Sequence, residues 1–129
     1  MSKVLINTFD IDGVIYFGPK HYGVRPCEMD IIVTGRSYEQ REETEKMLQS
    51  RGIYNRVVYN PLRRSDPKYG REASGKHKAA AITKLEEFSD YKVGMHFEDD
   101  PIQIAEIKKL HPNLNIIHLV RESEEYVKY

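Results

Sequence analysis

The sequence predicts an α/β protein built on a doubly wound parallel sheet of about five strands. Short apolar runs rich in β-branched residues alternate with helical patterns, the order expected when parallel strands are joined by crossover helices. Three of these runs end abruptly in polar and charged residues, which is how strands deliver side chains to one edge of an open parallel sheet. At 129 residues the chain has room for one domain with a substantial core, so residues 1–129 are predicted to form a single domain.

The first strand is predicted at Val4–Phe9, an apolar run that ends in two acids and a glycine. Because successive strand residues point to opposite sides, Asp10 and Asp12 are expected to meet in the crevice beyond the strand. A strand running into an ordinary Asp-Gly turn gives the same pattern, so the motif alone leaves both interpretations open. The next segment, Val14–Pro26, holds two aromatic runs around a Gly-Pro-Lys-His sequence, which predicts a β-hairpin flap beside the acids.

The second strand is predicted within Met29–Arg36, where a β-branched run again ends in a polar residue, a glycine and a charge. Ser37 and Gln40 then form a capping-box pattern, which predicts a helix that continues to about Ser50. A short third strand is expected at Arg56–Tyr59.

The second half of the chain continues this alternation. Asn60–Ser74 contains two prolines, a glycine and several charges, so it is predicted to be a loop, and the Ala79–Leu85 region behind it is predicted to be helical. Lys92–Phe97 is the predicted fourth strand and ends in three acids. A proline suited to a first helical turn and an apolar stripe predict a helix over Pro101–Leu110, and Asn115–Leu119 is the predicted fifth strand.

The composition excludes several function classes. Twenty Lys and Arg residues balance twenty Asp and Glu residues, so no overall field would steer the protein to nucleic acid or membrane, and any charged site must be local. The single cysteine, Cys27, cannot form an internal disulfide, and the sequence shows neither a signal-peptide pattern nor an apolar stretch of about eighteen residues. We therefore expect a soluble, cytoplasmic protein without a membrane partner, either a monomer or a homodimer.

Residues that can carry chemistry follow three of the predicted strands and open one of the predicted helices. They are Asp10 and Asp12, then Thr34, Gly35 and Arg36, then Lys76 and Lys78, and last Glu98, Asp99 and Asp100. This ordered set spans nearly the whole chain and resembles the motifs of the haloacid dehalogenase (HAD) superfamily, which implies a HAD-like, Rossmannoid phosphatase. The Thr-Gly-Arg and Phe-Glu-Asp-Asp stretches look most like the 3′-phosphatase domain of phage-type polynucleotide kinase and its small phage and bacterial relatives.

The residue types suit phosphoryl transfer, and the resemblance assigns them the same roles. Asp10 can attack phosphorus and form an aspartyl phosphate, which splits one difficult displacement into two easier ones. Asp12, two residues on and on the same side, can protonate the leaving oxygen and later activate water. Lys78 and the Thr34 hydroxyl would neutralise the phosphoryl oxygens. These four are the predicted catalytic residues.

A magnesium ion is the predicted cofactor, because hard cations prefer the oxygen ligands that cluster here. The predicted ligands are Asp10, Asp12 through its carbonyl group, Asp99 and the neighbouring Asp100. Several assignments have a structural alternative, since Thr34 taken alone is typical of an ordinary strand and Asp99 and Asp100 are typical of helix caps. Lys76 stays an alternative to Lys78, because both lie in one basic stretch.

One feature departs from the superfamily pattern. Relatives usually place a helix between the hairpin and the second strand, but only Cys27 and Glu28 separate Pro26 from Met29. The commonest substrate cap is inserted at that position, so we expect a capless enzyme with an open site. The sheet face that lacks the helix would be covered by the hairpin, by the tail Arg121–Tyr129 or by a second subunit.

The loop before the predicted catalytic lysine carries a local excess of positive charge. Its basic residues are Arg63, Arg64, Lys68, Arg71, Lys76 and Lys78, against the acids Asp66 and Glu72. Beside an open site, such a loop would favour a nucleotide or the 3′-phosphate end of a nucleic acid as substrate. The predicted substrate-binding residues are Thr34, Gly35, Arg36, Lys76, Arg63 and Arg64.

Other functions stay open. A basic loop can also be an ordinary solvated surface, in which case the substrate would be a small non-nucleotide phosphate ester. A catalytically silent binding domain would keep the fold but lose an acid, and the presence of both Asp10 and Asp12 argues against it. A receiver-type signalling domain also clusters acids and a lysine at strand ends, but this sequence lacks the acids that precede its phosphorylated strand.

Overall fold

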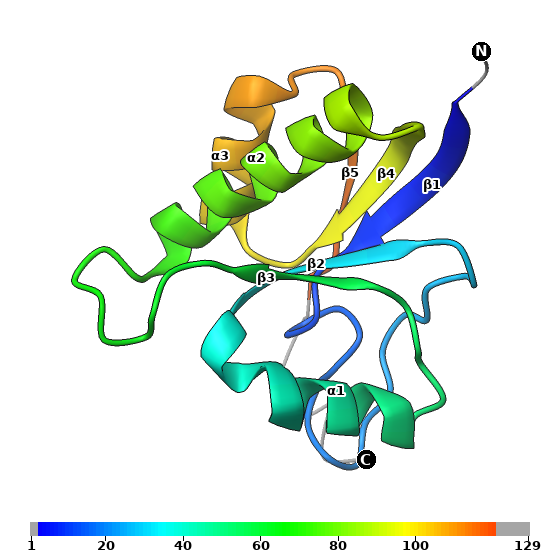
Figure 1. Cartoon of the computed structure of the whole chain (residues 1–129), viewed down its shortest axis with the longest axis vertical. Helices are drawn as coiled ribbons and strands as arrows, with labels where there is room; N and C mark the ends of the chain where they lie inside the picture. Colours follow the sequence, from blue (N-terminus) through cyan, green and yellow to red (C-terminus); the bar gives the residue numbers. More distant parts are fainter. Residues whose placement is uncertain (1–2, 121–129) are drawn as a thin grey trace.

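A computed structural model describes residues 3–120 and shows the predicted α/β architecture. The strands are β1 (Val4–Phe9), β2 (Ile31–Ser37), β3 (Val57–Asn60), β4 (Tyr91–Glu98) and β5 (Asn115–His118), and the helices are α1 (Arg41–Ser50), α2 (Arg71–Phe88) and α3 (Pro101–Leu110). All five strands are parallel and lie in the order β3-β2-β1-β4-β5. Helices α2 and α3 cover one face of the sheet and α1 lies on the other (Figure 1). The predicted doubly wound parallel sheet is confirmed.

Two apolar clusters join the sheet to α2 and α3. The first contains Ile6, Ile31, Val33, Ala81 and Leu85, and the second contains Ala79, Ile82, Val93 and Ile107. The two helices approach each other so closely that a Cβ atom on Gly75 would lie 2.7 Å from the Cβ of Glu106. Glycine is therefore required at this crossing, which brings the beginnings of α2 and α3 to the same edge of the sheet.

The predicted capping box is present at the end of β2. Gln40 Oε1 accepts the Ser37 N–H at 3.1 Å, and Ser37 Oγ accepts the Glu39 N–H at 3.2 Å. The box opens a single 3₁₀ turn, Tyr38–Gln40, which leads directly into α1. The helix therefore begins where the sequence signal placed it, with its first turn wound more tightly.

Helix α2 is longer than predicted. It begins at Arg71, directly after Gly70, whereas the loop was expected to continue through Ser74, and it runs on through Gly75 at the crossing with α3. Both candidate lysines consequently lie inside the helix rather than at its opening. Lys78 is fully buried, and Lys76 is exposed.

The segment predicted as a β-hairpin flap doubles back as expected but forms no regular strands. Gly23 N–H donates to Ile15 O at 3.0 Å and Val24 N–H donates to Val14 O at 2.8 Å, and isolated bridges complete the pairing. Val14 and Ile15 are both buried although they are neighbours in the chain. Two consecutive inward side chains do not fit the alternation of a strand, so the segment turns instead.

Residues 11–26, called here the segment after β1, cover the sheet face that lacks a helix at this point of the chain. Its buried side chains are Ile11, Val14 and Ile15, and they pack with Phe9, Ile32, Leu48 and Ile53 in one cluster. Of the three covers expected from the sequence, the segment after β1 is thus present and shares this face with α1. The second candidate, the tail Arg121–Tyr129, lies outside the described residues.

Arg51, directly after α1, fastens the segment to the rest of the fold. Its guanidinium donates to the carbonyl groups of His21 at 2.8 Å and Gly18 at 2.7 Å. The same group lies over the rings of Tyr16 and Tyr22, 4.7 and 5.0 Å from their centroids. One side chain therefore joins the end of α1 to several points of the segment after β1.

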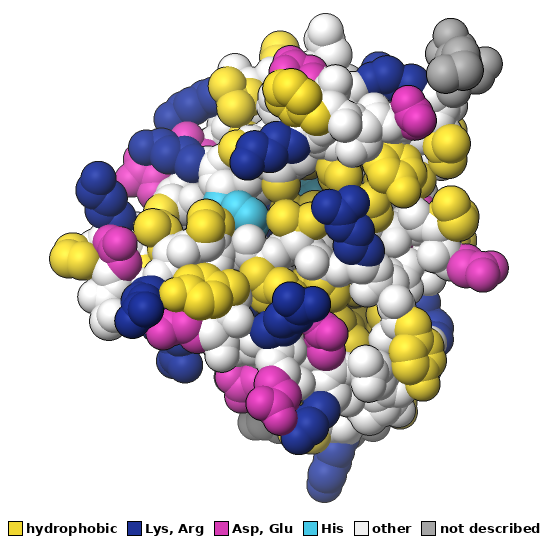
Figure 2. All heavy atoms as spheres, viewed as in Figure 1, with side chains coloured by type: hydrophobic (Ala, Val, Ile, Leu, Met, Phe, Trp, Pro, Cys, Tyr) yellow, Lys and Arg dark blue, Asp and Glu magenta, His cyan; other side chains and the backbone are white. Residues whose placement is uncertain are grey.

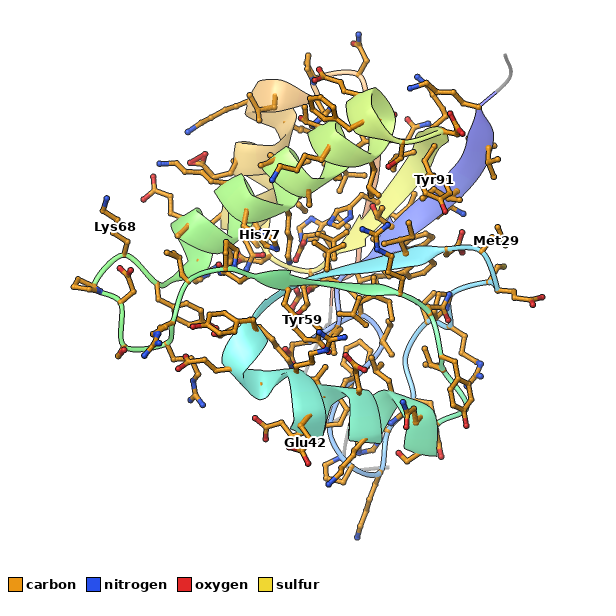
Figure 3. The ribbon with its side chains drawn as sticks, viewed as in Figure 1. Met29, Glu42, Tyr59, Lys68, His77 and Tyr91 are labelled. Carbon is orange, nitrogen blue, oxygen red and sulfur yellow. The ribbon has the colours of Figure 1, made fainter. Side chains whose placement is uncertain are left out.

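The face of the described residues that Figure 2 shows carries no block of a single charge. Acidic and basic side chains are interspersed over the face seen in Figure 2, in line with the balanced composition. Lys68 points into solvent from the loop before α2, whereas Tyr59 of β3 points toward α1, where its hydroxyl lies 3.0 Å from Glu45 Oε2 (Figure 3). Within residues 3–120, each helix is too short or too polar to cross a membrane.

Replacing Arg51 by Ala should release the segment after β1. We expect the free energy of unfolding to fall by about 1–3 kcal/mol, the range for hydrogen bonds made by a charged donor, and the amides of residues 14–24 to exchange faster with solvent. Urea unfolding and hydrogen exchange measure these effects. Arg41→Ala is the matched control, because its exposed pair with Glu45 should contribute less than about 0.5 kcal/mol. Equal losses in the two variants would contradict the role assigned to Arg51.

Candidate active site

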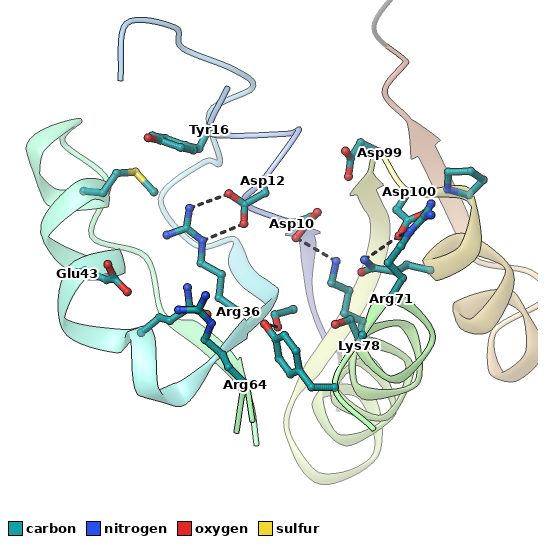
Figure 4. A pocket seen from close by; sticks show the side chains of 18 residues that line it. Asp10, Asp12, Tyr16, Arg36, Glu43, Arg64, Arg71, Lys78, Asp99 and Asp100 are labelled. Atoms are coloured by element: carbon teal, nitrogen blue, oxygen red, sulfur yellow. Dashed lines mark hydrogen bonds and ion pairs between the residues drawn. The ribbon is translucent and has the colours of Figure 1, made fainter. Parts of the chain in front are cut away.

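Three buried charged groups meet where β1 and β4 end. Lys78 Nζ lies 3.0 Å from Asp10 Oδ1 (Figure 4). It also lies 2.7 Å from Glu98 Oε1, and each of these three side chains is at least nine-tenths buried. Lys78, rather than Lys76, is thus the lysine that lies against Asp10. A buried ammonium group held by two carboxylates is an unusual arrangement, because each charge is costly to remove from water.

The sheet topology brings these groups together. β1 and β4 are parallel neighbours with Phe9 opposite Phe97, so the residues at their ends emerge at the same edge. The two phenylalanine rings stack with centroids 4.4 Å apart, and Asp10 N–H donates to Phe97 O at 3.1 Å. Lys78 reaches the same point from the second turn of α2, whose apolar side packs on the sheet.

Burial and the neighbouring charges shift the pKa values in this cluster in opposite directions. Burial raises the pKa of Asp10 well above its ordinary value, Lys78 opposes this shift and Glu98 adds to it. Burial alone would lower the pKa of Lys78, but the two carboxylates raise it. Burial likewise disfavours the ionised form of Glu98, yet Lys78 and His96 hold the pKa of this carboxyl below its ordinary value. Lys78 and Glu98 therefore favour each other's charged forms, whereas burial is the largest influence on the pKa of Asp10.

Three carboxyl groups in this cluster fit a divalent cation. One oxygen from each of Asp10, Glu98 and Asp99 lies within 4.8 Å of the others. Glu98 Oε2 is buried and has no hydrogen-bond partner among the described residues. With all three ionised, the carboxylates exceed the single ammonium by two negative charges, and oxygen ligands of this kind suit a hard ion.

Gly13 makes room for Asp99. Its φ of +82° is in the left-handed region that favours glycine, and a Cβ atom there would lie 2.0 Å from Asp99 Oδ2. Burial and then Glu98 raise the pKa of Asp99, which is half-buried beside the other two acids. The glycine of the Asp-x-Asp-Gly sequence therefore has a steric role in the site.

Asp12 lies at the rim of the site and is held by Arg36. The guanidinium donates to both carboxylate oxygens, at 2.9 and 2.7 Å, and the Asp12 side chain remains 57% exposed (Figure 4). Arg36 is itself anchored, because Nη1 donates to Thr44 Oγ1 at 3.1 Å and the group lies 5.5 Å from the centroid of the Tyr16 ring. The predicted substrate-binding arginine and the predicted general acid thus form one bidentate pair.

Asp100 makes a second bidentate pair, with Arg71. The two arginine nitrogens lie 2.9 and 2.5 Å from its oxygens, and Asp100 Oδ1 also accepts the Ile102 N–H at 3.0 Å. Asp100 is therefore the cap of α3, as the structural alternative held, and it joins the beginnings of α2 and α3. The carboxylates of Asp12 and Asp100, two of the four predicted magnesium ligands, are thus both occupied by arginines.

Thr34 and Gly35 occupy different environments. Thr34 is fully buried, its hydroxyl accepts the Arg36 N–H at 3.0 Å, and it does not line the cleft described below. Gly35 does line the cleft, where a Cβ atom would lie 2.8 Å from Ser74 Oγ. Its carbonyl group accepts a hydrogen bond from the Tyr69 hydroxyl at 3.1 Å. The close approach of β2 to α2 therefore depends on this glycine.

The six basic residues around the loop before α2 do not form one patch. Arg71 and Lys78 are engaged in the ion pairs described above. Arg63 donates to a tyrosine of the 3₁₀ turn at 3.1 Å and lies outside the cleft, as does the exposed Lys76. Arg64 lines the cleft, and its guanidinium makes no hydrogen bond or ion pair with another described residue.

A cleft of about 870 Å³ opens above the cluster at the carboxyl ends of β1, β2 and β4. Its walls carry the acids that follow β1 and β4, one acid of α1, and arginines from β2, from the loop before α2 and from α2 (Figure 4). The charged lining residues are Asp10, Asp12, Arg36, Glu43, Arg64, Arg71, Lys78, Asp99 and Asp100. The cleft exceeds the volume of one phosphoryl group, so it has room for the rest of an ester substrate.

Sequence reasoning gave Glu98 no role of its own. It appeared only as the first of three acids, yet in the structure it is fully buried against Lys78. One signal was available, since a glutamate that ends a buried parallel strand needs a cation or a hydrogen-bond donor. The sequence could not show which group would supply it.

The fold and the site together define a Rossmann-like, doubly wound α/β protein with a lysine-centred carboxylate cluster at the carboxyl edge of its sheet. No protein-family model matches the sequence, and no curated protein matches it. The fold is similar to that of a chain in the structure of the Pnkp1/Rnl/Hen1 complex, with a TM-score of 0.61 and 16% sequence identity over 90% of this chain. The match covers 45% of that chain, so the present chain spans less than half of its length.

Replacing Lys78 by Met should leave Asp10 and Glu98 buried without a cation. We expect the free energy of unfolding in metal-free buffer to fall by roughly 3–5 kcal/mol, as when one partner of a buried pair is removed. Lys76→Met is the control, because this exposed side chain of the same helix should change the value by less than about 0.5 kcal/mol. Urea unfolding of both variants measures the difference. Similar values for the two would contradict the central place of Lys78.

Proposed function

We propose that this protein is a magnesium-dependent phosphomonoester hydrolase that works through an aspartyl-phosphate intermediate. The observation that carries the proposal is Asp10, held through one oxygen by Lys78 at the floor of an open cleft, with Asp12 two residues further at the rim. A nucleophilic carboxylate with a fixed cation on one side and a second carboxyl group within the same turn is what covalent phosphoryl transfer requires.

The residues divide the reaction into two steps. In the first, the free oxygen of Asp10 attacks phosphorus, the bond between phosphorus and the ester oxygen breaks, and Asp12 gives that oxygen a proton. In the second, Asp12 takes a proton from water, the water oxygen attacks the aspartyl phosphate, and inorganic phosphate leaves with Asp10 restored. Arg36, which holds Asp12 in the structure, can pass to the phosphate oxygens when a substrate enters, and this frees Asp12 for proton transfer.

Magnesium suits this site through Asp10, Glu98 and Asp99, whose oxygens converge beside the orphaned Glu98 Oε2. When bound, such an ion would supply positive charge to the phosphoryl oxygens. The proposal keeps Asp12 as a ligand through its main-chain carbonyl and Asp100 as a neighbouring carboxylate. Lys78 adds the fixed cation that the chain itself provides.

The proposal is tested with an aryl phosphate, whose product is coloured. We expect hydrolysis with magnesium, none in excess chelator, and poor replacement by calcium, whose larger shell loosens the geometry. Asp10→Asn should abolish turnover and stay folded, because the amide oxygen still accepts from Lys78 while Glu98 balances its charge. Asp12→Asn should lose turnover but retain phosphate binding. Full activity with chelator, or more than a few per cent of wild-type activity in Asp10→Asn, would refute the mechanism.

For the substrate, we propose a nucleotide or the 3′-phosphate end of a nucleic acid. Arg64 supports this choice, since it lines the cleft and has no partner there, and it can bind a phosphate beyond the reacting one. Tyr16 lines the same cleft, and its ring, together with the Arg36 guanidinium 5.5 Å from its centroid, supplies planar groups near a bound base. The likeness to a chain of the Pnkp1/Rnl/Hen1 complex supports the fold on which this proposal depends.

Arg64→Ala should lower kcat/KM for a 3′-phosphorylated oligonucleotide by about tenfold, the effect of one lost phosphate contact, and should leave the aryl phosphate rate unchanged. Arg63→Ala is the neighbouring control, because Arg63 lies outside the cleft. The rates are measured across a salt series, in which the Arg64 variant should show a weaker salt dependence. A sugar phosphate that is hydrolysed faster than the oligonucleotide would favour the small-ester alternative, and no hydrolysis of any ester would favour a silent binding domain.

A further inference from the structure

The buried cluster continues past Glu98 into the middle of the sheet. His96 Nε2 lies 3.0 Å from Glu98 Oε1, and His96 Nδ1 lies 2.7 Å from Thr8 Oγ1. Thr8 and His96 are fully buried and lie opposite each other in the pairing of β1 with β4. Hydrogen bonds and ion pairs therefore form an unbroken chain of contacts through Thr8, His96, Glu98, Lys78 and Asp10. None of the proposed reaction steps uses Thr8 or His96.

The chemistry of each group fixes the direction of these hydrogen bonds. A neutral imidazole carries a single N–H, on one of its two nitrogens, and accepts through the other. Glu98 Oε1 already accepts from the Lys78 ammonium at 2.7 Å, so it meets His96 as an acceptor and His96 Nε2 donates to it. His96 Nδ1 is then an acceptor, and the Thr8 hydroxyl must donate to it. Thr8 thus selects the tautomer of His96, which directs its N–H at Glu98.

We propose that Thr8 and His96 are positioning residues that hold the Glu98 carboxylate, and through it the Lys78 ammonium, in place beside Asp10. Glu98 Oε1 accepts from both His96 and Lys78, so the histidine fixes the oxygen on which the lysine rests. The catalytic consequence depends on the proposed function: a displaced Lys78 would leave the Asp10 nucleophile misaligned. The placement of Lys78 itself does not depend on any reaction.

A second threonine–histidine pair provides a matched control. Thr83 Oγ1 of α2 lies 2.9 Å from Nε2 of His111, which follows α3, and this pair has no contact with the cleft. The Thr83 hydroxyl also donates to Ala79 O at 3.0 Å, so Thr83→Val removes a threonine–histidine contact, and this helix hydrogen bond with it, at a place where only stability can respond. Thr8→Val removes the donor to His96, and Thr8→Ser keeps the hydroxyl while removing a methyl group.

The first readout is nuclear magnetic resonance of the metal-free protein. In the wild type we expect His96 to be protonated at Nε2 and the Lys78 ammonium protons to exchange slowly with water. Thr8→Val should give mixed His96 tautomers and faster Lys78 exchange, while Thr8→Ser and Thr83→Val should match the wild type. An Nδ1-protonated His96 in the wild type, or an unchanged Lys78 signal in Thr8→Val, would overturn the proposal. The wild-type spectrum decides the tautomer even if a variant fails to fold.

The second readout is kinetic and uses the aryl phosphate assay. Thr8→Val should lower kcat by about 10–100-fold with KM unchanged. This is the usual effect of removing a residue that supports the reacting groups through another side chain. Thr8→Ser and Thr83→Val should keep kcat within about twofold of the wild type. Equal losses in Thr8→Ser and Thr8→Val would overturn the role of the hydroxyl. A wild type without phosphatase activity would refute the proposed function, and the spectroscopic result would still decide how Lys78 is held.

Discussion

The rest of the structure depends on the ammonium of Lys78, buried between Asp10 and Glu98. Moving these charges out of water costs several kcal/mol for each ion, and good geometry on both sides of the lysine must offset that cost. The parallel pairing of β1 with β4 supplies the two acids, and α2, the crossover that leads into β4, supplies the lysine. The strand order that places β1 beside β4 is therefore also what brings the two acids and the lysine of the site together.

Most of the fold was predictable because its signals are local. The β-branched runs marked the strands and the Ser37–Gln40 capping box marked the beginning of a helix. The flap after β1 was predicted less well, since the aromatic runs around its turn suggested alternation while Val14 and Ile15 both point into the core. Val14 and Ile15 point inward because they cover an apolar face of the sheet, and that face is formed with residues distant in the sequence, such as Ile32 and Leu48.

The site was predictable to the extent that it follows from strand ends. Asp10, Asp12 and Asp99 lie around one cleft because parallel strands deliver the residues that follow them to one edge, and Lys78 reaches the same cleft from α2. The pairings of Arg36 with Asp12 and of Arg71 with Asp100 depend on how separate elements are set against each other. The roles of Glu98 and His96 depend on cross-strand register, which one sequence does not reveal. The Thr34 hydroxyl, by contrast, is held by a local hydrogen bond that it accepts from the Arg36 N–H, two residues further along the chain.

The anchoring of the segment after β1 by Arg51 bears on how molecules enter and leave the cleft. In many enzymes a mobile lid closes over the substrate, and its opening sets the pace of product release. Here the segment nearest the acids is tied to the end of α1 through carbonyl groups and stacked rings, and its own side chains are part of the core. A segment held at this many points is a wall beside the cleft rather than a lid above it.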